Sequence, residues 1–207
     1  MRKRRSREDF FEAELALALR GTGCPVCALA RETERAVVSW LATTNIREEA
    51  TIAKLLDARG LCATHWASVL ERGGGDLGAS GARLLARIAT AAAEDVEDGR
   101  VKPSPPCPVC ASVARRERSI LALLFASLAE PQGAAAYHLS AGLCRPHVEL
   151  AIDVAPEPAT LRTLAAMHRR SLIRLAGRAI AAANDAEARV PPIRRLIALL
   201  AGSRLSR

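Results

Sequence analysis

Apolar positions recur along most of this chain with the spacing of amphipathic helices. In residues 25–42, four apolar side chains fall on one helical face: Leu29, Val37, Trp40 and Leu41. The same periodicity predicts further helices at 46–58, 62–72 and 79–97, then again at 108–129, 132–141, 145–153, 158–187 and roughly 193–201. Glycines at 73–75 are expected to stop the helix that begins at residue 62. The pattern predicts an all-α protein.

The composition strengthens this prediction. Half of the 207 residues are hydrophobic, but only six are aromatic, and alanine is abundant. Such a mixture favours helices and argues against a β-sandwich or barrel, which draws on β-branched and aromatic residues. The apolar content is too high for a disordered chain. No apolar run reaches the roughly 18 residues that a transmembrane helix requires.

The first twenty residues do not resemble an export signal. Acidic residues interrupt the short apolar run where a signal peptide needs an unbroken one: Glu8, Asp9, Glu12 and Glu14. Residues 8–20 instead predict an amphipathic helix that ends at Gly21. We therefore expect a cytoplasmic protein whose six cysteines are reduced thiols or metal ligands.

All six cysteines belong to one pattern that occurs twice. The first copy is Cys-Pro-Val-Cys at 24–27, followed by Gly-Leu-Cys-Ala-Thr-His at 60–65. The second copy is Cys-Pro-Val-Cys at 107–110, followed by Gly-Leu-Cys-Arg-Pro-His at 142–147. The helices that follow each CPVC element also align. The chain is therefore an internal duplication with an offset of 82 to 83 residues.

Each copy supplies three cysteines and one histidine, which is a standard ligand set for a structural zinc ion. The eight predicted ligands are Cys24, Cys27, Cys62, His65, Cys107, Cys110, Cys144 and His147. Proline after the first cysteine fits the first position of a helix, and the Cys and His of GLCxxH lie three residues apart on one helical face. Two zinc ions per chain are expected. An iron–sulfur cluster is the alternative, since thiolates select both.

The pairing of these ligands is a separate question. Pairing within each copy gives two equal Cys₃His sites, and duplication favours it because each copy would have been self-sufficient. A cross-brace would give one Cys₄ and one Cys₂His₂ site. We expect pairing within each copy, with the metal ion holding together the base of a helical hairpin.

This expectation divides the chain into five parts. A basic disordered arm occupies 1–8, and an N-terminal helix with the first metal-binding repeat occupies 9–98. A proline-rich linker at 99–106 leads to the second metal-binding repeat at 107–188, and a C-terminal helix and tail occupy 189–207. The predicted fold is two tandem repeats of helical hairpins, each with its own Cys₃His site.

The charges are distributed unevenly. The first residues contribute five positive charges, from Arg2, Lys3, Arg4, Arg5 and Arg7. Residues 8–99 have a net charge of −6 and residues 100–207 a net charge of +9. This asymmetry suggests an anionic partner such as nucleic acid or a ribosomal surface, a protein partner, or pairing between the two halves.

The sequence favours a non-catalytic interaction module over an enzyme. It contains no HExxH, Walker A or GxSxG motif, and four protein ligands would close each metal site to substrate. A thiolate-based metal or redox sensor is the alternative, because loss or oxidation of the thiolates would unfold a repeat.

The twin CPxC and GxCxxH elements, on residues 24 to about 150, resemble those of uncharacterised bacterial zinc-binding proteins of the domain-of-unknown-function kind. The resemblance rests on the eight ligands. It implies a helical metal-binding fold and carries no activity with it.

Overall fold

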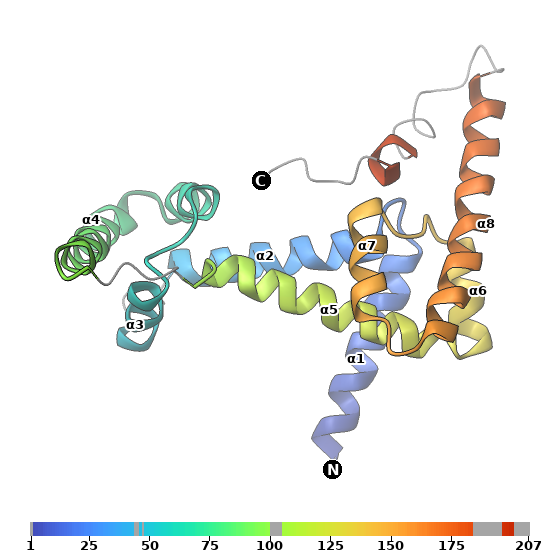
Figure 1. The fold of residues 1–207 in the computed structure, drawn as a ribbon, viewed down its shortest axis with the longest axis horizontal. Coiled ribbons are helices and arrows are strands. Elements are labelled where there is room, and N and C mark those ends of the chain that lie inside the picture. The colour runs from blue at the N-terminus through green and yellow to red at the C-terminus, as the bar shows by residue number, and fades with distance from the viewer. Residues whose placement is uncertain (1, 44–45, 47, 100–104, 184–195, 201–207) are drawn as a thin grey trace. The chain divides into compact units, whose positions relative to one another are not determined.

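The computed structural model of the protein describes residues 2–43, 46, 48–99, 105–183 and 196–200, and its regular structure in these ranges is helical throughout (Figure 1). The all-α prediction is confirmed. The helices are α1 (Arg2–Leu19), α2 (Pro25–Thr43), α3 (Glu49–Asp57), α4 (Ala63–Glu97), α5 (Pro108–Leu128), α6 (Pro131–Leu139), α7 (Arg145–Val154) and α8 (Pro158–Ala183). In these ranges no single helix is long and apolar enough to cross a membrane; α5 and α6 satisfy the length and composition criteria only as a pair, which is bent by 117°.

The chain forms two compact units, which we call unit 1 (Met1–Ala30 and Arg116–Arg207) and unit 2 (Arg31–Arg115). The chain leaves unit 1 within α2 and returns to it within α5. Both crossings therefore lie inside the helices that follow the CPVC elements. The linker predicted at 99–106 stays a prediction, because residues 100–104 lie outside the described residues.

The core of unit 1 combines α1, the start of α2, the second half of α5 and the helices α6 to α8. Helix α6 packs against both α1 and α8. Residues 196–200 are helical, and the buried Leu199 packs into this core. This short helix packs through Leu196 and Leu199, which are three residues apart and share a face, whereas Ile197 and Leu200 are exposed.

The core of unit 2 combines the second half of α2 with α3, α4 and the start of α5. Its buried members include Val38, Leu55, Val69 and Val109. Trp40, which the pattern placed on the buried face of α2, is 48% exposed. Neighbouring Val38 takes the inward position instead.

Helix α4 runs through the glycines at 73–75, where the sequence had predicted a stop. The equivalent place in the second copy is Ala155-Pro156-Glu157, and there the helix does break, between α7 and α8. Each glycine costs a helix about 1 kcal/mol, so the three together cost about as much as one proline. Glycine keeps its N–H and fits the helical backbone, so apolar packing of α4 through Val69, Leu84 and Ile88 can offset the cost, whereas a proline lacks the N–H and clashes with the preceding turn.

Helix α1 begins at Arg2, so from residue 2 the segment predicted as a disordered arm belongs to a helix. Arginine and lysine are good helix formers, and this segment runs directly into the apolar part of α1 that packs in unit 1. The positive charges therefore occupy the first turns of a helix that is anchored by Leu15 and Leu19.

Each GLCxxH element begins with a glycine that needs a positive φ, at Gly60 (96°) and Gly142 (80°). After α3, Gly60 N–H donates to Leu55 O and Arg59 N–H donates to Leu56 O, which is the hydrogen-bond pattern of a Schellman motif. The turn at Gly60 ends α3, whereas α6 ends before Gly142, at Ser140, where the backbone becomes extended.

Replacing Gly142 with alanine is expected to lower the free energy of unfolding by about 1–2 kcal/mol. Alanine at this position would have to keep the positive φ, and its methyl group would lie 2.9 Å from His168 Nδ1. Urea unfolding of the metal-loaded protein measures the effect. The matched control is Gly177→Ala in α8, where an added Cβ meets nothing within 4 Å. This control should gain up to about 1 kcal/mol, and equal losses in both variants would contradict the strain argument.

Candidate metal centres

The eight predicted ligands gather into two groups of four in the structure. Cluster 1 consists of Cys24, Cys27, Cys144 and His147, and cluster 2 of Cys62, His65, Cys107 and Cys110. Within each cluster the four donor atoms all lie within 4.8 Å of one another. Each is therefore a Cys₃His group that could hold a metal ion.

The predicted pairing within each copy is wrong. Each cluster takes its CPVC pair from one copy and its Cys–His pair from the other. The cross-brace is wrong as well, because both clusters contain three cysteines and one histidine. The path of the chain explains the exchange. The chain leaves unit 1 along α2, so Cys62 and His65 lie in unit 2 with the start of α5, and Cys144 and His147 return to unit 1.

Every cluster lies at the beginning of two helices. Cys62 and Cys144 are the N-cap residues of α4 and α7. Cys24 and Cys107 stand directly before α2 and α5, and their carbonyls accept the first helical hydrogen bonds, from Ala28 and Ala111. A helix N-terminus has a partial positive charge of about +0.5, which stabilises thiolates. Two such termini per cluster offset part of the charge of three thiolates.

Cluster 1 is compact and buried in unit 1. His147 Nδ1 lies 3.0 Å from the Sγ atom of Cys144, 3.3 Å from that of Cys27 and 3.5 Å from that of Cys24. The Sγ atoms of Cys27 and Cys144 are 3.5 Å apart. One nitrogen and three sulfurs therefore converge on a common centre.

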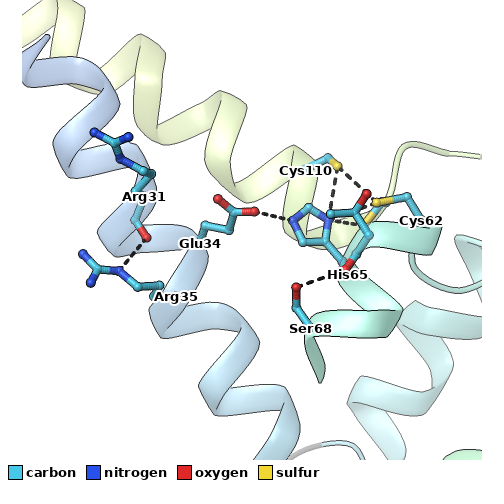
Figure 2. Close-up of polar contacts among 9 residues, drawn as sticks. Arg31, Glu34, Arg35, Cys62, His65, Ser68 and Cys110 are labelled. Atoms are coloured by element: carbon cyan, nitrogen blue, oxygen red, sulfur yellow. Dashed lines mark hydrogen bonds and ion pairs between the residues drawn. The ribbon is translucent and has the colours of Figure 1, made fainter. Parts of the chain in front are cut away.

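Cluster 2 repeats this geometry in unit 2 (Figure 2). His65 Nδ1 lies 3.1 Å from the Sγ atom of Cys62, 3.4 Å from that of Cys110 and 3.5 Å from that of Cys107. The Sγ atoms of Cys62 and Cys110 are 3.9 Å apart. In both clusters the histidine uses the same ring nitrogen.

The other ring nitrogen of each histidine meets a glutamate. His65 Nε2 lies 2.9 Å from Glu34 Oε1, and His147 Nε2 lies 3.2 Å from Glu117 Oε1. Figure 2 shows Glu34 reaching from α2 to the side of the His65 ring opposite the thiols. A carboxylate in this position fixes the ring and the tautomer of a metal-bound histidine. No role was predicted for these glutamates from the sequence; their shared spacing, seven residues after the second cysteine of CPVC, was the available signal.

The Cys24 thiol and the His147 imidazole of cluster 1 both have raised pKa values. Burial raises the pKa of the Cys24 thiol well above its ordinary value, and the thiols of Cys144 and Cys27 raise it further. Burial lowers the pKa of His147, but its hydrogen bonds to Cys144, Cys27 and Glu117 outweigh this and raise the pKa to about 11. Since a metal ion needs thiolates and a neutral imidazole, binding must expel the protons of these two groups. The apparent metal affinity therefore falls as the pH falls.

The pKa values of two cysteines in cluster 2 are shifted in opposite directions. Burial raises the pKa of Cys107, but backbone N–H groups of Cys110, Cys62 and Val109 outweigh it and lower the pKa to about 7. Burial, and then the charge of Cys107, raises the pKa of Cys110 to about 12. The donors at Val109 and Cys110 belong to the CPVC turn, and the donor at Cys62 comes from the GLCxxH element.

The side chain of Arg145, which lies between two ligands in sequence, is exposed and pairs with Glu149 at 3.0 Å. The basic residues Arg2, Lys3, Arg4, Arg5 and Arg7 lie in the first turns of α1, outside both clusters.

Comparison of the chain with known protein families, with curated proteins and with solved structures finds no match. The resemblance stated from the eight ligands therefore stays a prediction.

Paired substitutions test the exchange of ligands between the copies. Cys27→Ser with Cys144→Ser removes two ligands of cluster 1, so the protein should keep one tightly bound ion per chain. Cys27→Ser with Cys62→Ser removes two ligands of the same copy but one from each cluster, so both ions should be lost to a chelator. Metal analysis after dialysis gives the counts, and the reverse result would restore pairing within each copy.

Each glutamate should affect the cluster whose histidine it contacts, and not the cluster that contains the CPVC cysteines of its own helix. Glu34→Gln is expected to weaken metal binding in cluster 2 by about 10- to 100-fold, although Glu34 lies on the helix that follows Cys24 and Cys27. Glu117→Gln should weaken cluster 1 by a similar factor. Chelator competition on chains that retain a single cluster, as in the Cys27/Cys144 variant for Glu34, measures each affinity. No loss for either glutamine would show that the carboxylates do not orient the histidines.

Proposed function

We propose that this protein is a non-catalytic zinc protein in which two Cys₃His centres stabilise a helical interaction module. The observation that carries the proposal is the convergence of eight ligands into two four-donor groups. Four protein ligands complete a tetrahedral zinc site and leave no position for substrate, as in structural zinc sites.

The distances within the clusters support zinc. A tetrahedral zinc ion has bonds of about 2.3 Å to sulfur and about 2.0 Å to nitrogen, which give donor–donor separations of about 3.5 to 3.8 Å. The pairs quoted above run from 3.0 to 3.9 Å. An iron–sulfur cluster spreads its ligands around several metal atoms, whereas here all four donors face one point. The six free thiols also suit a reducing compartment, and we propose the cytoplasm.

The charge of the two units supports an anionic partner for unit 1. Unit 2 contains eleven basic and eleven acidic side chains, so it is neutral. Unit 1 contains nineteen basic and eleven acidic side chains, so it carries the whole net charge of +8. Nucleic acid, either free or on a ribosomal surface, is the anion that we propose. The basic turns of α1 are the contact: Arg2, Lys3, Arg4, Arg5 and Arg7.

Metal analysis with an absorption spectrum, on protein purified without added metal, is the first test. We expect two zinc ions per chain and no visible band. Iron with sulfide and a broad visible band would replace zinc with an iron–sulfur centre.

Binding to a short DNA duplex and to a single-stranded RNA at several salt concentrations tests the partner. Alanine at the five basic positions of α1 should weaken DNA binding and reduce the salt slope by up to about 4.5. The control removes the same charge from exposed positions of unit 2: Arg31, Arg35, Lys54, Arg83 and Arg87. Equal losses in both variants, or no binding by the parent chain, would contradict the assignment to α1.

A further inference from the structure

The two clusters have the same ligands but differ in burial. In cluster 1, Cys24, Cys27 and Cys144 are 5%, 9% and 1% exposed. In cluster 2, Cys62 and Cys110 are exposed and Cys107 is half-buried. Only the two histidines are alike, since His65 and His147 are both buried.

The cysteines of cluster 1 belong to a hydrophobic core that extends beyond the two copies. All three are members of the unit 1 core together with Leu15 and Leu19 of α1 and with Leu199. These three leucines lie outside both copies of the repeat. In unit 2, only Cys107 among the cluster cysteines packs against the core, and it does so while partly exposed.

The outer carboxylates follow the same division. The side chain of Glu117 is 15% exposed, whereas that of Glu34 is 38% exposed. Cluster 2 is therefore exposed to solvent at two places. One is at Cys62 and Cys110, and the other is at Glu34, the carboxylate that orients His65. Cluster 1 is closed on both sides.

Resting on the proposed metal binding, we propose that cluster 2 is an oxidation-sensitive release centre, whereas cluster 1 keeps its ion as a permanent structural centre. The reactivity of a metal-bound thiolate toward an oxidant or a competing ligand depends on access to the sulfur. Cys62 and Cys110 offer that access, and their Sγ atoms lie only 3.9 Å apart. The regulated event is loss of the unit 2 ion under oxidation by a peroxide.

The chemistry of release is a two-electron oxidation. The Cys62 and Cys110 thiolates each lose one electron and form one S–S bond. Hydrogen peroxide accepts the two electrons, its O–O bond breaks, and with two protons it yields two water molecules. The metal ion loses two of its four ligands and dissociates. A thiol reductant reduces the S–S bond to two thiols again and restores the site.

The test treats the zinc-loaded full chain with hydrogen peroxide and follows free zinc with a coloured chelator. One ion should leave at least about tenfold faster than the other. Mass mapping after the fast phase should find Cys62 and Cys110 oxidised and the cluster 1 cysteines intact. Release of both ions at one rate, or earlier oxidation of Cys24, Cys27 or Cys144, would overturn the proposal.

The duplication offers matched control variants. Cys110 and Cys27 hold the same position in the two copies. Cys110→Ser should abolish the fast phase and leave the slow one, whereas Cys27→Ser should abolish the slow phase and leave the fast one. If a variant fails to fold, the mass mapping of the parent chain still decides. A chain that binds no metal would refute the proposed function itself, whereas two ions that leave together would refute only the difference between the clusters.

Discussion

The length of the helix that follows each CPVC element decides how the metal ligands can meet. Helix α2 has 19 residues and therefore advances about 28 Å, whereas α3 has 9 residues and recovers at most about 14 Å. In the structure, Cys62 and His65 stay in unit 2, where the start of α5 supplies Cys107 and Cys110. The same difference in length holds for α5 and α6, with 21 and 9 residues. Each copy therefore gives its second ligand pair to a cluster begun by the other copy.

Helices α2 and α5 each serve both clusters as a consequence. Helix α2 begins with the cysteine pair of cluster 1 and, seven residues after Cys27, presents Glu34 to the histidine of cluster 2. Helix α5 does the converse, with the cysteine pair of cluster 2 and then Glu117 at His147. Seven residues are two helical turns, so a cysteine and its glutamate lie on one face. A change in either helix therefore affects the residues of both Cys/His clusters.

Most of the helices, and the eight Cys and His residues that gather into the clusters, could be predicted from the sequence because they depend on local signals. The CPVC and GLCxxH motifs and the proline at the first helical position are each specified by neighbouring residues. The pairing of the ligands depends on where long helices end, which motif spacing does not contain. The failure at glycines 73–75 has a similar origin, because packing of α4 in the core of unit 2 outweighs a local helix-breaking signal.

The exchange of ligands also changes what the duplication means. A single copy cannot complete either cluster, whereas two copies complete both by reciprocal donation, as in a symmetric dimer that exchanges identical elements. Joining the copies in one chain preserves the donor sets but removes the symmetry, because α1 and the C-terminal segment cover only unit 1. Identical ligands then acquire different surroundings. The difference in burial accompanies both the packing of α1 and Leu199 in unit 1 and the break between α7 and α8, where unit 2 has the continuous helix α4.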